Sequence, residues 1–348
     1  MRIAGANHQE LFFLVSILLF PPILGSFFLD DREAPSWRGG LSGRRRVTVG
    51  VIESAMGKLR HFSRLAILAS GLVLAVASSA IGQSKHMLFR VRGATGTALY
   101  LLGSVHLLTP EAGKLPAAVD SAFANAKIVG FETSIDSLQQ RAAELLAKAR
   151  YANGATLRSS LSPEHVTAID SIMHLYGLSI AQLNAYKPWF VGLAMSQLVM
   201  QRAGFQPQYG VDVQLNQRAR DAGKTILGLE SVDFQLNLFD SMTPADQELM
   251  LLKDKGPAED AKALELMKSA WLAGDPARLD SLVRTSDAFS PTLQAALVTN
   301  RNRSWIPQLE ALLGGKDDAL VVVGAAHLVG DQGVLALLRA KGYKIEQL

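Results

Sequence analysis

The chain of 348 residues contains no cysteine. This absence excludes disulfide bonds, thiolate nucleophiles, and zinc or iron–sulfur sites with cysteine ligands. It also excludes a lipid anchor on a cysteine behind a cleaved signal. The chemistry of this chain must therefore come from other side chains, and imidazole and carboxylate groups are the first to consider.

Most of the chain also lacks net charge. The whole sequence is formally +4, but nine of its 35 Lys and Arg and five of its 31 Asp and Glu lie in residues 1–82. Residues 83–348 therefore hold 26 basic and 26 acidic side chains and are formally neutral. Because nucleic-acid binding relies on an excess of positive charge, we expect no nucleic-acid partner.

A secretory signal is predicted well inside the chain. Residues 56–64 form a basic segment, residues 65–77 are apolar and uncharged, and residues 78–83 offer small side chains for cleavage after Gly82 or Ala80. This order is typical of a signal peptide. We therefore expect a periplasmic or secreted protein without stable membrane insertion once the signal is removed.

The position of this signal predicts how the chain is divided. We expect Met56 to be the true start, residues 1–55 to come from an over-extended gene model, residues 56–82 to be the signal, and residues 87–348 to be the functional domain. The alternative is that the apolar run at residues 11–29 is a membrane helix or the real signal. Against this alternative, two prolines interrupt the run and no basic cluster precedes it.

The functional domain alternates strand and helix patterns without a low-complexity linker. Residues 86–92 alternate apolar and basic side chains, residues 93–96 supply turn residues, and residues 99–103 are apolar, which predicts an opening hairpin. Helical patterns dominate the middle of the domain. We expect a single α/β domain with a central mixed sheet and a large helical insertion.

One short signature occurs twice in this domain. Residues 99–106 and 320–327 each form an apolar strand pattern that runs into Gly-x-x-His. A helix pattern and a strand pattern follow each copy, so we predict repeated strand-GxxH-helix-strand units at the two ends of the domain. We expect each pair of strands to be parallel. The expected helices and strands are residues 115–126 and 127–132, and residues 332–341 and 343–347.

The insertion between these units contains several helix starts. Pro163 and Pro188 stand at expected first helical positions, the former behind Ser162 as a cap. Thr243-Pro244 and Asp275-Pro276 mark two further starts. Residues 224–230 predict a third central strand that ends on a carboxylate.

Four candidate metal ligands lie at the ends of predicted strands. These are His106, Glu132, Glu230 and His327. Side chains at the carboxyl ends of strands in an open α/β sheet gather around one cleft. Two imidazoles with one or two carboxylates suit a divalent ion that keeps an open water position. The ion would lower the pKa of its water, and a free glutamate would carry the proton in a hydrolysis without a covalent intermediate.

Two further residues have open interpretations. Arg301 lies in a helical segment, where an arginine usually faces solvent, but it could instead hold a substrate carboxylate or a developing oxyanion. Asp212 follows Gly210-Val211 and is expected to cap a helix, or alternatively to line the cleft.

Several separated motifs in this order and spacing resemble the TraB/GumN family. The resemblance covers residues 87–348. One departure is Asn300, since family members often carry an acidic residue directly before Arg-Asn. The motifs are Leu99-Tyr100-Leu101-Leu102-Gly103-Ser104-Val105-His106, Phe131-Glu132, Lys187-Pro188-Trp189, Gly210-Val211-Asp212, Gly228-Leu229-Glu230-Ser231 with Gln235, Arg301-Asn302, and Val323-Gly324-Ala325-Ala326-His327-Leu328.

The family is similar to the Tiki metalloproteases, and more remotely to erythromycin esterase and the haem-binding ChaN proteins. This resemblance implies a metal-dependent hydrolase, most readily a peptidase, that uses manganese, cobalt or zinc and acts on a peptide or small-molecule substrate. It places His106, His327 and Glu132 at the centre, with Glu132 as ligand or general base and Glu230 as a further ligand. The alternative is a non-catalytic haem or small-ligand binding protein, or an accessory factor in envelope polysaccharide export.

Overall fold

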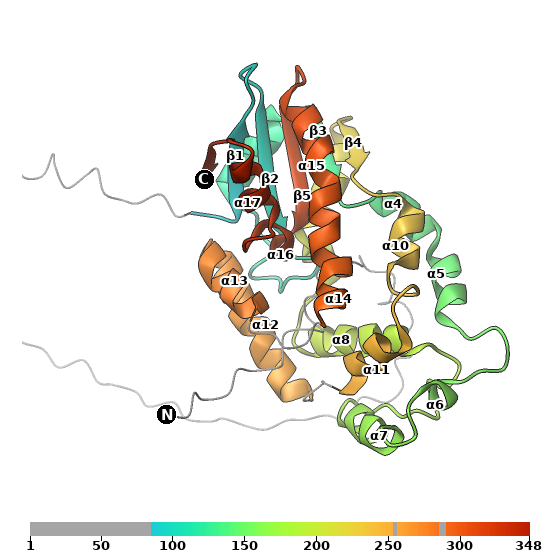
Figure 1. The fold of residues 1–348 in the computed structure, drawn as a ribbon. Helices are drawn as coiled ribbons and strands as arrows, with labels where there is room; N and C mark the ends of the chain where they lie inside the picture. Colours follow the sequence, from blue (N-terminus) through green and yellow to red (C-terminus); the bar gives the residue numbers. More distant parts are fainter. Residues whose placement is uncertain (1–84, 253–255, 285–289) are drawn as a thin grey trace, which may run out of the picture. The chain divides into compact units, whose positions relative to one another are not determined.

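Figure 1 shows the fold in a computed structural model, which describes residues 85–252, 256–284 and 290–348. The expected extension at residues 1–55 and the expected signal at residues 56–82 lie outside the described residues. Among the helices that are described, none has the length and apolar character needed to cross a bilayer.

A six-stranded sheet organises the described residues in the order β4-β3-β5-β2-β1-β6. β4, β3, β5 and β2 are parallel to one another, whereas β1 is antiparallel to both of its neighbours. The sheet is therefore mixed, as predicted. The strands are β1 (Leu88–Arg92), β2 (Ala98–Ser104), β3 (Ile128–Phe131), β4 (Thr225–Gly228), β5 (Ala319–Gly324) and β6 (Ile345–Gln347).

The two Gly-x-x-His strands are neighbours at the centre of the sheet. Every residue of β2 and of β5 is buried, and both strands are rich in leucine or valine. Such continuous apolar strands are typical of parallel strands covered on both faces. Ser104 pairs with Gly324 in the register, so the two motifs leave the sheet side by side at the same edge.

Helices cover the sheet and form the insertion, which confirms the expected α/β class. The described residues form one compact unit. The helices are α3 (Ala117–Asn125), α4 (Ile135–Gln140), α5 (Ala142–Ala149), α6 (Leu157–Ser160), α7 (Val166–Leu175), α8 (Pro188–Arg202), α9 (Val211–Asp221), α10 (Val232–Leu238), α11 (Pro244–Leu252), α12 (Pro257–Leu272), α13 (Pro276–Arg284), α14 (Pro291–Gln294), α15 (Asn300–Leu313), α16 (Ala325–Leu328) and α17 (Val334–Ala340).

Proline marks the starts of several helices, as the sequence predicts. α8, α11 and α13 begin at Pro188, Pro244 and Pro276. α7 is different, because it begins at Val166 rather than directly behind Ser162. The backbone N–H and the hydroxyl of Ser162 both donate to the Glu248 carboxylate, each at 2.8 Å. Ser162 therefore joins α7 to α11 instead of capping a helix.

The strand order departs from the prediction in three places. β5 lies between β2 and β3, so the two strands of the first unit are parallel but not adjacent. β6 likewise pairs with β1 rather than with β5. β4 lies at the edge of the sheet rather than at its centre. Pairing between strands far apart in sequence decides this order, and local patterns carry no information about it.

The insertion packs around α8. Most of α8 is buried, including Trp189, and it contacts α11 and α12. Figure 1 shows this group of helices beyond the ends of β2 and β5. Residues that leave the sheet at that edge therefore enter a covered region rather than open solvent.

Candidate functional site

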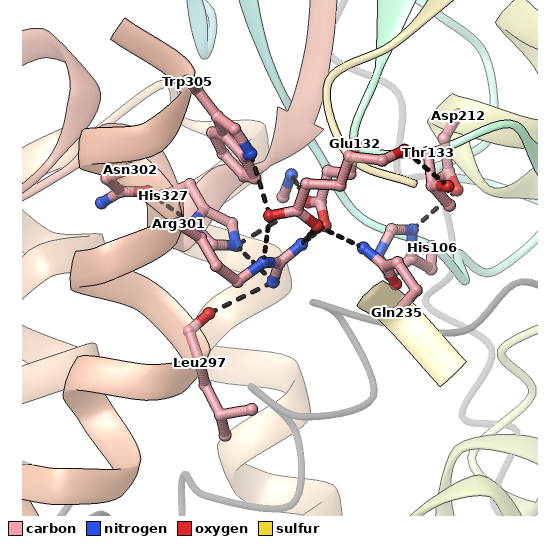
Figure 2. Close-up of polar contacts among 12 residues, drawn as sticks. His106, Glu132, Thr133, Asp212, Gln235, Leu297, Arg301, Asn302, Trp305 and His327 are labelled. Atoms are coloured by element: carbon pink, nitrogen blue, oxygen red, sulfur yellow. Dashed lines mark hydrogen bonds and ion pairs between the residues drawn. The ribbon is translucent and has the colours of Figure 1, made fainter. Parts of the chain in front are cut away.

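The four predicted ligands follow the ends of the four parallel strands. His106 follows β2, Glu132 follows β3, Glu230 follows β4, and His327 lies in α16 directly behind β5. His106 is 6% exposed, Glu132 7% and His327 0%. Figure 2 shows two groups of polar contacts, namely His106 with Asp212, and Arg301 of α15 with Glu132 and His327.

His106 is held by a carboxylate. Its Nδ1 lies 2.7 Å from Oδ2 of Asp212, which belongs to the first turn of α9. Gly210 makes this approach possible, because a Cβ at that position would lie 2.1 Å from the carbonyl oxygen of His106. The N–H of Val211 donates to the carbonyl of Val105 and fixes the two segments together. Gly210 is the N-cap of α9, so Asp212 does not cap the helix and lines the site instead.

This pairing fixes the chemistry of the His106 ring. A carboxylate only accepts hydrogen bonds, so Nδ1 carries the hydrogen and Nε2 of the neutral ring carries a lone pair. Nε2 is buried and has no hydrogen-bond partner. Burial lowers the pKa of His106, but the charge and hydrogen bond of Asp212 outweigh burial and raise the pKa above its usual value. The ring is therefore a strengthened base with a free acceptor atom.

Arg301 lies at the centre of the remaining predicted ligands and is only 1% exposed. Its Nη2 donates to Oε2 of Glu132 at 2.6 Å and to Oε2 of Glu230 at 2.9 Å, while its Nε donates to Oε1 of Glu230 at 2.8 Å. Its Nη1 donates to Leu297 O and to Nε2 of His327, each at 3.2 Å. All three guanidinium nitrogens are thus engaged. Its predicted role as a substrate anchor stays a prediction.

His327 has an amide partner instead of a carboxylate. Its Nδ1 donates to Oδ1 of Asn302 at 2.6 Å, and the Asn302 amide nitrogen in turn donates to Gln332 O, which fixes the orientation of the amide. Nε2 of the ring therefore accepts from Arg301. Burial, followed by the charge of Arg301, lowers the pKa of His327 well below its usual value. The ring is neutral, and both of its nitrogens are used.

Glu132 and Glu230 form the carboxylate part of the network. Oε1 of Glu132 accepts the N–H of Gly324 at 2.7 Å and lies 3.8 Å from Nε2 of His327. Burial raises the pKa of Glu132, and the charge of Arg301 opposes the rise. Glu230 also accepts from Trp305 Nε1 and from Gln235 Nε2. The two carboxylates are therefore held by donors from several elements.

A cavity of about 30 Å³ opens beside His106. His106, Asp212, Glu132, Gln235 and Ser104 contribute its polar lining, and side chains such as Phe131 contribute its apolar wall. Three lining residues carry a buried polar atom without a hydrogen-bond partner, namely Ser104 Oγ, His106 Nε2 and Asp212 Oδ1. A polar space needs roughly 10–15 Å³ and two to four polar partners to hold a water. This cavity has the required volume, and several polar residues line it.

The predicted four-ligand metal centre does not form in this arrangement. Among the described residues, no three His, Asp or Glu side chains are placed to hold a metal ion together. The guanidinium of Arg301 lies on the atoms that an ion shared by His327, Glu132 and Glu230 would need. His106 lines the cavity together with Asp212, and its Nε2 has no hydrogen-bond partner. The metal requirement stays a prediction.

Sequence reasoning missed some members of the site. Ser104 stands two residues before His106, on the same face of an extended segment, and this spacing could have indicated it. Trp305 follows Arg301 by one helical turn, and its ring lies 4.5 Å from that of His327. Asn302 and Gln235 appear in the motifs, but no role in the site was predicted for them. The close approach at Gly210 that brings Asp212 to His106 has no local signal.

The fold and the site together define a class of protein. It is an α/β domain in which two adjacent parallel strands end on Gly-x-x-His, beside a buried Glu–Arg–Glu cluster. The chain belongs to the TraB/PrgY/gumN family, whose model matches residues 87–347. This match confirms the resemblance noted in the sequence.

Relatives from two bacteria are similar to this chain. It is 26% identical over 242 residues to "Uncharacterized protein YbaP" of Escherichia coli (strain K12), which covers 69% of this chain and 87% of YbaP. The protein of the same name from Shigella flexneri matches with the same identity and coverage. No solved structure matches. The names of these relatives state no activity.

Proposed function

We propose that this protein is a hydrolase in which His106 acts as general base on a water held in the neighbouring cavity. The observation that carries the proposal is the buried His106–Asp212 pair, whose imidazole has an unpaired Nε2 and lines a cavity of water size. A carboxylate that orients an imidazole and stabilises its protonated form is a recurring arrangement in hydrolases.

The proposed reaction is attack of water on a carbonyl carbon. Nε2 of His106 takes a proton as the water oxygen forms its bond to the carbon, and Asp212 stabilises the resulting imidazolium. The tetrahedral intermediate then breaks its bond to the leaving nitrogen or oxygen. His106 returns the proton to that leaving group, so the products are a carboxylic acid and an amine or alcohol. The unpaired hydroxyl of Ser104 is a donor for the water or the substrate oxygen.

The Arg301 cluster supports this site by positioning. Glu132 lines the cavity and is held by Arg301 on one oxygen and by Gly324 on the other. A carboxylate fixed in this way gives the cavity a wall of constant shape and charge. Preorganised charges of this kind need no rearrangement during a reaction.

The substrate class that we propose is peptides. It rests on the resemblance to the Tiki metalloproteases, since peptide hydrolysis is the activity which that resemblance implies. Esters undergo the same attack with a better leaving group, so they serve as sensitive probes of the same residues.

We also propose that the protein is exported, on the basis of the signal pattern at residues 56–82. Mass spectrometry of the native amino terminus tests this proposal. A terminus near Gln83 supports export with cleavage. A protein that retains residues 11–29 contradicts both the cleavage site and the proposed start at Met56.

The test of hydrolysis compares His106→Gln with His174→Gln. His174 is an exposed helix residue, so its variant is a matched control. Turnover is measured on an internally quenched peptide library and on p-nitrophenyl butyrate. We expect the His106 variant to lose about two to four orders of magnitude, which is the contribution of general base catalysis, and the control to be unchanged. Equal turnover in both variants would contradict the proposal, and a Soret band with no turnover would favour the haem-binding alternative.

A further inference from the structure

The guanidinium of Arg301 lies where the predicted metal centre would be. It contacts three of the four expected ligands directly, at 2.6 Å for Glu132, 2.8 and 2.9 Å for Glu230, and 3.2 Å for His327. Each of these contacts is made to an atom that would have to face a bound cation. The cluster therefore already contains a cation of its own.

The contact with His327 decides whether the guanidinium of Arg301 and a divalent metal ion can occupy the cluster together. A neutral imidazole has a single lone pair, and in His327 it lies on Nε2 because Nδ1 donates to Asn302. A divalent ion on this lone pair would lie about 2.0–2.1 Å from Nε2. Nη1 of Arg301 already takes that lone pair at 3.2 Å, so an ion and the guanidinium would overlap. The two cations exclude one another at this atom.

Arg301 is also fixed in place from several sides. Its Nη1 donates to Leu297 O, which lies in the π-helical turn Ala295–Thr299 directly before α15. Its guanidinium carbon lies 5.1 Å from the centre of the Trp305 ring. Bidentate pairing with Glu230 adds geometric specificity to the charge. A side chain held by so many contacts will not leave the cluster readily to admit an ion.

We infer that Arg301 is the resident cation of this cluster, and that the wild-type protein binds no divalent ion through His327, Glu132 and Glu230. Arg301 then performs the neutralising and positioning role that a metal would have in such a ligand set. This inference goes beyond the proposed hydrolase, because it concerns what holds the cluster together and not which residue activates water.

A direct consequence is that removal of the guanidinium creates a metal site. Arg301→Ala leaves one imidazole lone pair and two carboxylates around an emptied space. Nitrogen and oxygen ligands of this kind suit zinc or manganese. Arg303 lies in the same helix as Arg301, is exposed, and donates to the side chain of Gln332. Arg303→Ala changes none of the cluster's groups and is therefore a matched control.

The experiment measures metal binding rather than turnover. Each protein is freed of metal with a chelator and titrated with ZnCl2 and with MnCl2 by calorimetry, and its melting temperature is recorded with and without the metal. We expect wild type and Arg303→Ala to show no saturable site that depends on His327. We expect Arg301→Ala to bind the metal at least about tenfold more tightly than any residual binding by wild type, and its melting temperature to rise on metal addition. Both effects should be lost when His327→Ala is added.

One equivalent of ion bound tightly by the wild-type protein, and lost in His327→Ala, would overturn the inference. If Arg301→Ala does not fold, Arg301→Lys retains the charge and should bind no ion, and the wild-type titration decides by itself. Failure of the proposed hydrolase shows itself differently, as turnover that survives in His106→Gln.

Discussion

His106 and His327 occupy the same place in two copies of one signature, yet their surroundings differ at every hydrogen bond. His106 donates to the carboxylate of Asp212 and keeps a free Nε2 beside the cavity. His327 donates to the amide of Asn302, and its Nε2 accepts from Arg301. Their pKa values accordingly move in opposite directions, since burial lowers both and only His106 has a carboxylate that outweighs burial.

This difference teaches that the signature sets the position of a histidine but not its role. In each copy, the strand and its glycine place the histidine ring at the same edge of the sheet. The partner that reaches Nδ1 comes from α9 in one case and from α15 in the other, and it decides whether the ring is a base or a neutral structural acceptor. Under the proposed function, His106 transfers the proton and His327 has a positioning role.

The largest expected effect comes from making His106 resemble His327. Asp212→Asn replaces the carboxylate by an amide, which cannot stabilise an imidazolium and permits the wrong ring tautomer. We expect turnover to fall by about 10²- to 10⁴-fold with little change in stability. Turnover on p-nitrophenyl butyrate with a parallel urea melt checks this result. A variant that folds normally and keeps full turnover would remove His106 from its role as base.

The next largest effect concerns Arg301, which contacts His327 and the two carboxylates. Arg301→Ala leaves Glu132 and Glu230 buried without their cation, and breaking a buried pair in this way costs roughly 3–5 kcal/mol. The exposed Arg303→Ala should stay within about 0.5 kcal/mol of wild type. Urea unfolding of the metal-free proteins measures both values. Equal stability of the two variants would show that the cluster is not held by Arg301.

A smaller effect is expected when the amide partner of His327 is replaced by a carboxylate. Asn302→Asp replaces the amide nitrogen that donates to Gln332 O at 2.8 Å, so the new carboxylate faces a carbonyl oxygen. An unsatisfied buried group costs about 1–3 kcal/mol. We expect a loss of stability in this range by urea unfolding and no gain of turnover. A gain of turnover would mean that His327 becomes a second base as soon as it has a carboxylate.

Much of the fold could be predicted because it depends on local chemistry. Pro188 at the start of α8 fixes a helical φ angle, and the turn at residues 93–96 joins two strands of a hairpin. The position of β5 between β2 and β3 could not be predicted in the same way. It depends on pairing between residues that are 191 positions apart for β3 and 220 for β2, for which the sequence has no local pattern.

The candidate site shows the same limit. His106 and His327 were indicated by a strand that ends on glycine, and the structure places both at one edge of the sheet. The sequence offers Asp212 and Arg301 as possible site residues, but it does not indicate which groups each of them contacts. Asp212 reaches His106 through a close approach at Gly210, and Arg301 reaches Glu132 and Glu230 across separate elements. Such contacts depend on tertiary packing and not on spacing along the chain.

A second histidine–carboxylate pair, in which the imidazole is exposed, gives a scale for the buried one. Oε1 of Glu248 lies 3.0 Å from Nδ1 of His165, and the carboxylate also accepts two hydrogen bonds from Ser162. Burial favours a raised pKa for Glu248, but the hydrogen bonds from Ser162 and His165 outweigh it and lower the pKa. A carboxyl group with a lowered folded pKa stabilises the fold above its unfolded pKa, which is about 4.3, and this contribution is lost as the pH falls through the folded value.

The smallest predicted effect follows from this pair. Glu248→Gln keeps the shape and one acceptor oxygen but removes the charge, so it should cost at most about 1 kcal/mol at pH 7. The difference from wild type should shrink as the pH is lowered below about 4, because the wild-type carboxyl group then becomes neutral as well. Urea melts of both proteins between pH 7 and pH 3 measure the difference. A difference that stays constant over this range would show that the charge of Glu248 does not contribute to stability.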